Sequence, residues 1–366
     1  MIIKQQSQFD QLIERIKAHN QITIDTEFFW VRTYFPILCL IQVSIDDDVF
    51  LIDTLNKDIN LTALTDVFEE SNIQKIMHSA ANDIPIIKHF LNCKVNNIFD
   101  TQVAANFLGY QNQVSLKTLL EEALNISIEK EEQFSDWRKR PLSEQQIEYA
   151  INDVKHLYLL KNHLEEQLNN NQYVDYFYDE MKNICNDSEF TNPNDAYLKA
   201  GNIQKYSAKT QRNIILLANW REATAQQKDI PIRFLFDNKD LFTIAALNPK
   251  SLDDFKDHPL SRLKLNLKKQ IIEVLNTKDD VSTLIKSKKN PIKLDEEFLE
   301  RTISFFESEV DKYTINKTFI ASKKNIRSLA YNLKLKNEFS NSKLLEGWRY
   351  KVVGKSLKEY ILKHMV

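Results

Sequence analysis

Two acidic residues, Asp25 and Glu27, interrupt an apolar stretch near the amino terminus. The run ITIDTEF is rich in β-branched and aromatic residues, which predicts a strand. Side chains alternate faces along a strand, so both acids lie on the same face as Thr23. Two negative charges this close repel each other, and one acid would be protonated unless a cation lies between them. The alternative is an edge strand whose polar face meets water.

A third acid, Asp83, lies in the segment MHSAANDIPII, where a predicted strand ends and a helix begins. The neighbouring His78 is a candidate substrate-binding residue. Both have a structural alternative, because the helix dipole stabilises an acid in the first turn and a histidine is often part of the packing. We interpret Asp100 only as the cap of the next helix.

A fourth acid lies in the segment QQIEYAINDVKHLYLL. Tyr149 and Asp153 are four residues apart and therefore share one face of a predicted helix, although such a pair is common in helices. Together the acids offer only oxygen ligands. Such ligands suit Mg²⁺ or Mn²⁺ better than zinc.

The composition excludes several classes of protein. With 366 residues, of which 43% are hydrophobic and 27% charged, the chain is expected to form two or three globular domains. No pair among its four glycines fits a Walker A loop or a dinucleotide-binding fingerprint, so a helicase, an oxidoreductase and any nucleotide cofactor lose support. No apolar run reaches the roughly 20 residues that span a membrane. Three widely spaced cysteines fit a reducing cytoplasm.

The net charge of −2 hides a division between the two halves of the chain. Residues 1–200 contain 17 basic and 31 acidic side chains, a balance of −14. Residues 201–366 contain 32 and 20, a balance of +12. Solvated helix faces are the alternative explanation, but such an asymmetry is typical of nucleic-acid binding by the basic part.

Residues 1–195 are predicted to form a mixed α/β sheet with helices packed on it. An amphipathic helix is expected near Phe9–Ala18, and a turn at the sequence DDD, residues 46–48. We expect strands over 22–28, 37–45, 48–53 and 73–80. Helices are expected over 61–70, over 82–92 with Asn82 as its candidate cap, over 100–110, over 115–124, and around Tyr149.

Beyond a polar linker over 185–199, the remaining chain is predicted to be helical. One long helix is expected to stop before Pro231. We predict two helical domains, over 205–285 and 290–366, joined by a basic linker at 287–293. Lys286, Lys288 and Lys289 flank this linker and could face RNA; solvated linker charge is the alternative.

The order of the acidic motifs resembles that of the DEDD exonuclease superfamily. Its signature is Asp-x-Glu on the first strand, an Asp at a strand-to-helix junction and Tyr-x-x-x-Asp on a late helix. Tyr149 marks the DEDDy branch, because the proofreading type has a histidine where this chain has Glu148. The wider sequence is similar to ribonuclease D in the motifs DTEF, RTYFP, LCLIQ, HSAANDIPII, FDTQVAA and SDWRKRPLSEQQIEYA.

The tail continues the resemblance. The segment WREATAQQKDIPIRFLFDNKDLFTIAALNP is similar to a first helicase-and-RNase-D C-terminal (HRDC) domain, and the remainder resembles a second one more loosely. One departure from the family is YAINDV, where two alanines usually precede the aspartate. The substituted residues lie between Tyr149 and Asp153, so the spacing of the motif survives.

The resemblance implies a ribonuclease H-like exonuclease fold that uses two divalent cations, Mg²⁺ or Mn²⁺, about 4 Å apart. It implies that Asp25 bridges both ions and that Glu27 and Asp153 complete the site of the ion holding the attacking water. Asp83 would hold the other ion, mostly through water. Tyr149 would orient the attacking water, because a phenol with a pKa of about 10 is a poor general base at neutral pH.

The segment FFWVRTYFP directly follows the catalytic strand and supplies candidate substrate-binding residues. Arg32 would contact a phosphate, and Trp30, Tyr34 or Phe35 would stack on terminal bases. The alternative is that these aromatic residues fill a gap in the core.

From these observations we expect a 3′-to-5′ exoribonuclease that releases nucleoside 5′-monophosphates. The family resemblance suggests a monomer that trims the 3′ ends of transfer RNA precursors and other structured RNAs. One alternative is a DNA exonuclease of the Werner type, although that domain is usually joined to a helicase. The other is a non-catalytic RNA-binding protein on the same fold, against which the presence of all four acids argues.

Overall fold

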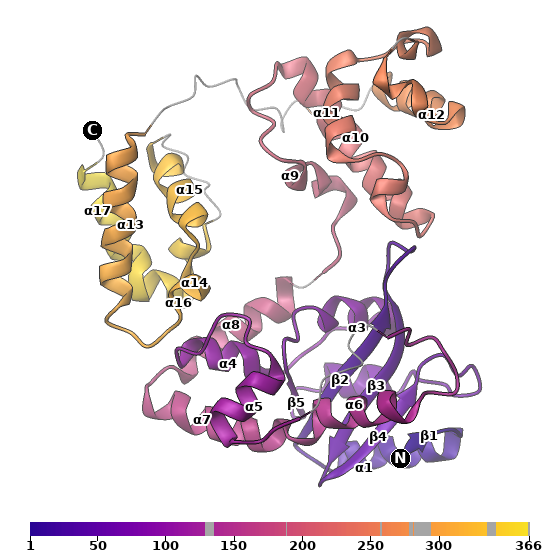
Figure 1. Cartoon of the computed structure of the whole chain (residues 1–366), viewed down its shortest axis with the longest axis vertical. Coiled ribbons are helices and arrows are strands. Elements are labelled where there is room, and N and C mark those ends of the chain that lie inside the picture. Colours follow the sequence, from indigo (N-terminus) through magenta and orange to yellow (C-terminus); the bar gives the residue numbers. More distant parts are fainter. Residues whose placement is uncertain are drawn as a thin grey trace. The chain divides into compact units, whose positions relative to one another are not determined.

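The computed structural model describes residues 1–128, 135–187, 189–256, 258–277, 281, 294–334 and 342–364. Contacts divide the chain into two compact units, shown with the whole chain in Figure 1. Unit 1 comprises Met1–Phe29, Leu38–Glu189 and Lys293–Val366, and unit 2 comprises Trp30–Ile37 and Phe190–Ile292. The predicted linker lysines Lys286, Lys288 and Lys289 lie outside the described residues.

A six-stranded mixed sheet forms the centre of unit 1, with the strand order β1-β4-β3-β2-β5-β6. β4 is antiparallel to β3, whereas the pairs β1/β4, β2/β5 and β5/β6 are parallel. This confirms the expected mixed sheet. The strands are β1 (Ile2–Ile3), β2 (Gln21–Phe29), β3 (Ile37–Ile45), β4 (Asp48–Asp53), β5 (Gln74–Met77) and β6 (Ile98–Asp100).

The strands β3 and β4 have the predicted bounds, and both Asp46 and Asp47 adopt positive φ in the turn between them. The predicted strand over 73–80 is shorter, because β5 ends at Met77 and the chain turns at Ser79 with φ 64°. β1 and β6 were not predicted. Strands of two or three residues are too short for a period-2 pattern to reveal them.

In the described part of residues 6–187, eight helices pack on this sheet and on each other. Thr23 Oγ1 on β2 donates to Val154 O on α6 at 3.0 Å, so α6 covers the face of β2 that bears Asp25 and Glu27. The helices are α1 (Gln6–Lys17), α2 (Leu64–Glu69), α3 (Asp83–Leu91), α4 (Thr101–Phe107), α5 (Leu116–Leu124), α6 (Glu144–Lys155), α7 (Leu157–Asn170) and α8 (Val174–Asp187).

The predicted cap of α3 is wrong in one respect. Asn82 precedes the helix, but its side chain makes no capping hydrogen bond, because its backbone is already helical with φ −83° and ψ −33°. Asp100 does cap α4, and its carboxylate accepts from the N–H groups of Gln102 and Val103.

The carboxy-terminal helices belong to unit 1 and pack against α8. Glu180 on α8 accepts hydrogen bonds from Trp348 Nε1 at 2.7 Å and from the guanidinium of Arg349. All three side chains are buried. This part contains α13 (Glu296–Val310), α14 (Lys317–Ile320), α15 (Lys323–Lys334), α16 (Gly347–Arg349), a π-helical turn (Tyr350–Gly354) and α17 (Lys355–His364).

Unit 2 is a helical body around α10 (Ala208–Gln227), which is the long helix predicted before Pro231. Its core includes Ile214, Leu217 and Leu241, each fully buried. The polar stretch predicted as a linker instead contains the end of α8, a 3₁₀ turn (Pro193–Asp195) and a short helix. The other helices of the unit are α9 (Ala196–Ala200), α11 (Asn238–Leu247) and α12 (Leu265–Leu275).

Across the described ranges of the chain, no helix is both long and apolar enough to cross a membrane. None of the three cysteines forms a disulfide bond.

The buried Glu180–Arg349 pair generates a prediction about stability. We expect Glu180→Ala to lower the free energy of unfolding by about 3–5 kcal/mol, because it leaves the Arg349 charge buried without its partner. Arg327→Ala is a matched control, since its ion pairs with Glu296 and Glu300 are solvent-exposed, and it should change stability little. Urea unfolding measures both, and equal effects of the two substitutions would contradict the prediction.

Candidate active site

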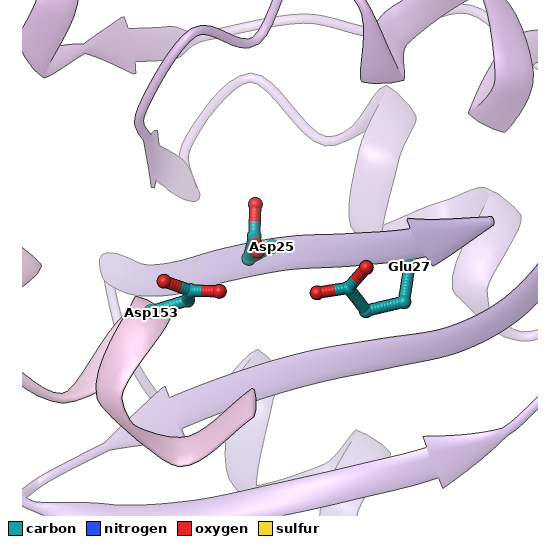
Figure 2. Close-up of side chains that lie close together, drawn as sticks. All are labelled: Asp25, Glu27 and Asp153. Carbon is teal, nitrogen blue, oxygen red and sulfur yellow. The ribbon is translucent and has the colours of Figure 1, made fainter. Parts of the chain in front are cut away.

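The structure brings three of the four predicted acids together. Oxygen atoms of Asp25, Glu27 and Asp153 all lie within 4.8 Å of one another, and each residue is partly buried. Figure 2 shows that the first two project from β2 and the third from α6. The pleat of the strand and the face of the helix therefore meet at one point.

Electrostatic repulsion and burial make this group unfavourable when all its members are ionised. Desolvation, followed by the charges of Asp153 and Asp83, raises the pKa of Glu27 to about 9. The same causes, together with Glu27 itself, raise the pKa of Asp25 well above its usual range. An oxygen-only donor set with this excess of negative charge fits a hard divalent cation such as Mg²⁺ or Mn²⁺.

Asp83 lies near this group but is not one of its three members. Its negative charge raises the pKa of both Asp25 and Glu27, which places it within electrostatic reach. Asp83 is 6% exposed and accepts a hydrogen bond from Thr26 Oγ1. Burial raises the pKa of Asp83 to about 7 despite this bond.

Tyr149 lies one turn before Asp153 on α6, and its hydroxyl is hydrogen-bonded to that carboxylate. Desolvation and the charges of Asp153, Glu27 and Asp25 raise the Tyr149 pKa far above that of a free phenol. The hydroxyl therefore keeps its proton at neutral pH. It can donate a hydrogen bond but cannot act as a general base.

His78 is held by the protein on both sides of its ring. Its Nδ1 lies 2.9 Å from Thr101 Oγ1 and its Nε2 lies 3.0 Å from Val114 O. This geometry is typical of a histidine that is part of the packing rather than of a substrate-binding residue, because both ring nitrogens already contact protein groups.

The aromatic residues after β2 differ in their burial. Tyr34 is 8% exposed and its hydroxyl donates to Glu222 on α10, while Asp229 accepts from the backbone N–H groups of Tyr34 and Phe35 at 2.9 and 3.0 Å. Tyr34 thus packs inward, within unit 2. Trp30 is 59% exposed, with its Nε1 bonded to backbone carbonyls.

Arg32 is exposed on the same segment. Trp30 and Arg32 therefore keep the side-chain surface that an RNA contact requires, whereas Tyr34 does not.

Two residues that support the site were not recognised from the sequence. Thr26 holds Asp83 from β2, and a threonine on a strand gives no signal of such a role. Asp100 accepts from the N–H groups of Ser79 and Ala80 at 3.0 and 2.8 Å, and so shapes the turn that leads into Asp83. Its position at a helix start predicted only the cap.

Fold and site together define a 3′-5′ exonuclease domain, and the family model of that description matches residues 1–169. A model of the HRDC domain matches residues 215–264. The chain is 30% identical over 264 residues to Ribonuclease D of Desulfotalea psychrophila, an alignment that covers 71% of this chain and 70% of that protein. The chain belongs to the ribonuclease D family.

The chain is also similar to other ribonuclease D proteins. Ribonuclease D of Bartonella henselae is 33% identical over 262 residues, with 70% of this chain and 63% of that protein covered. The chain thus spans somewhat less than two thirds of that relative's length. The crystal structure of Escherichia coli RNase D, described as an exoribonuclease involved in structured RNA processing, has the same fold. It matches with a TM-score of 0.87 at 23% identity, covering 100% of this chain and 99% of that one.

These comparisons confirm the exonuclease fold with a mixed sheet, followed by a helical HRDC domain. The HRDC model does not extend to the region 290–366, so a second HRDC-like domain there stays a prediction.

The raised pKa of Glu27 generates a prediction about stability and pH. Between its usual pKa of about 4.5 and its folded pKa of about 9, the folded chain holds a proton that the unfolded chain has lost. Stability without metal should therefore fall as pH rises through this window. With divalent ions removed by a chelator, we expect the melting temperature to fall by several degrees from about pH 5 to about pH 8, because each pH unit in this window costs up to about 1.4 kcal/mol of stability.

Glu27→Gln should make this pH profile shallower and raise the melting temperature at the upper end. Glu148→Gln, which removes an exposed acid from α6, is the matched control and should leave the profile unchanged. Differential scanning calorimetry measures all three proteins. A wild-type profile that rises with pH in this window would show that the acids are not mutually destabilising.

Proposed function

We propose that this chain is a 3′-to-5′ exoribonuclease that hydrolyses RNA from a free 3′ end and releases nucleoside 5′-monophosphates. The observation that carries the proposal is the convergence of Asp25, Glu27 and Asp153, with Tyr149 bonded to Asp153. Membership in the ribonuclease D family supports the choice of RNA as the substrate.

The four acids would hold the divalent ions, which we propose to be two Mg²⁺ or Mn²⁺. Asp25, central on β2, would bridge them; Glu27 and Asp153 would complete one site and Asp83 the other. Bound ions would lower the pKa of the attacking water and stabilise the charge on the attacking and leaving oxygens. Tyr149, whose hydroxyl donates its one proton to Asp153, would orient that water by accepting a hydrogen bond from it.

The charge division supports a separation of tasks between the two parts of the chain. The acidic residues 1–200 would repel RNA until cations neutralise the site, and the basic residues 201–366 would attract the phosphate backbone. We propose that Trp30 and Arg32 contact the RNA near its 3′ end, since both are exposed and directly follow β2. Tyr34 and His78, which bond within the protein, are not included.

We further propose that the substrates are transfer RNA precursors and other structured RNAs, and that the chain acts as a monomer in the cytoplasm. The free cysteines fit a reducing compartment. A time course on a 3′-extended transfer RNA, with and without divalent metal, tests the substrate. Stepwise shortening from the 3′ end is expected, whereas internal cuts would point to endonucleolytic cleavage. A matched DNA oligonucleotide should be hydrolysed more slowly.

Replacement of Asp25 tests the site directly. We expect Asp25→Ala to reduce the hydrolysis rate by about three orders of magnitude or more, because it removes the ligand shared by both ions. RNA affinity, measured by fluorescence anisotropy in a chelator, should change little. Asp47→Ala, in the exposed turn after β3, is the control and should retain activity. Normal hydrolysis by Asp25→Ala would disprove the site assignment.

Replacement of Trp30 tests the substrate contact. We expect Trp30→Ala to raise KM for a single-stranded RNA about tenfold while kcat changes little, because a base would lose its stacking partner. Leu198→Ala removes an exposed apolar side chain of similar accessibility and should leave KM unaltered. An unchanged KM in both variants would show that Trp30 does not contact the substrate. Steady-state kinetics on one oligonucleotide is sufficient.

A further inference from the structure

The segment SDWRKRP, residues 135–141, is fixed to the sheet by Arg140. The Nε and Nη2 atoms of Arg140 each lie 2.6 Å from a carboxylate oxygen of Asp53 at the end of β4, and Nη2 also donates to Cys39 O of β3 at 2.9 Å. Its Nη1 donates to Trp137 O at 2.7 Å. The backbone at Trp137 is therefore held against two strands.

Two further contacts hold the same segment beside the active site. The guanidinium of Arg138 lies over the ring of Phe29 at 3.5 Å from its centroid, and Phe29 is the last residue of β2. Gln146 of α6 donates to Ser135 Oγ at 2.9 Å. The segment is thus joined to the strand that carries Asp25 and Glu27 and to the helix that carries Asp153.

The Trp137 side chain lies between these attachments and contacts Tyr149. It is 1% exposed, and the two ring centroids are 6.0 Å apart with an interplanar angle of 48°. Tyr149 in turn is hydrogen-bonded to Asp153. Trp137 is therefore one side chain removed from the carboxylate group, although it is not itself an acid or a ligand.

The indole N–H of Trp137 is not what holds this residue in place. Among the described residues, Trp137 Nε1 is buried without a hydrogen-bond partner. Trp348, equally buried, donates its Nε1 to Glu180 at 2.7 Å. The contribution of Trp137 must come from the shape of its ring, since a buried unpaired donor is unfavourable.

We propose that Trp137 is a positioning residue, whose ring fixes the orientation of Tyr149 so that its hydroxyl remains on Asp153. The inference rests on the proposed nuclease function for its kinetic consequence. Its physical basis is that a tyrosine side chain on a helix has more than one rotamer, and close packing selects one of them. A misplaced hydroxyl would orient the attacking water poorly without weakening RNA binding.

Two substitutions of Trp137 test the role of the ring. Trp137→Leu removes the ring face and should lower kcat by about ten- to a hundredfold with little change in KM. Trp137→Phe keeps an aromatic face, although it loses part of the indole volume together with the unpaired donor, so it should restore kcat to within about threefold of the wild type. Should the leucine variant not fold, Trp137→Met offers a flexible, unbranched side chain that adapts to an irregular gap without a rigid ring, and it should show the same loss.

A double-mutant cycle separates positioning from general packing. If Trp137 acts through Tyr149, adding Trp137→Leu to Tyr149→Phe should lower kcat by less than about twofold further. An equal loss in both backgrounds, or a wild-type kcat in Trp137→Leu, would overturn the proposal. Trp348→Phe is the matched control: it removes a buried indole that donates to Glu180 on α8, and should lower stability but not kcat.

A spectroscopic measurement makes the test independent of turnover. With 3-fluorotyrosine incorporated, the fluorine signal that disappears in Tyr149→Phe reports the environment of Tyr149. It should shift or broaden in Trp137→Leu and stay close to the wild-type position in Trp348→Phe. An unchanged signal would overturn the positioning role even in an active nuclease. A changed signal in a protein that does not hydrolyse RNA would refute the proposed function alone.

Discussion

Mutual repulsion among carboxylates is the constraint on which the arrangement of unit 1 depends. Asp25, Glu27 and Asp153 meet within 4.8 Å, and desolvation and mutual charge oppose their ionisation. Such a group does not form unless the surrounding elements are held firmly enough to impose it. The bond from Thr23 to α6 and the bond from Thr26 to Asp83 provide this support from the strand itself.

The strand that carries the acids could be predicted because its chemistry and its periodicity agree. Alternation along 22–28 placed Asp25 and Glu27 on one face, and a spacing of four placed Tyr149 above Asp153. Both inferences are local, because they need only the geometry of one strand or one helix. Only the family resemblance predicted that the strand and the helix face each other. No rule of spacing connects residues about 130 positions apart.

What the sequence did not reveal depends on contacts between distant residues. The roles of Thr26 and Asp100 follow from bonds across 57 and 20 residues, and neither residue type signals them. Tyr34 was a candidate RNA contact, with packing into the core as the alternative, because the residue type alone does not distinguish these two environments. Its hydroxyl bonds to Glu222, 188 residues away, and its side chain is buried within unit 2.

The anchoring of Tyr34 also has a consequence for how the chain is made. Its backbone N–H and hydroxyl find their partners, Asp229 and Glu222, only after nearly two hundred further residues have been synthesised. At about 5–20 residues per second, this delay lasts roughly 10–40 seconds. During that time the segment 30–37, which connects β2 and β3, cannot form its contacts with Asp229 and Glu222. The exonuclease part is thus completed late, and a ribosome that stops at residue 195 would release it unfinished.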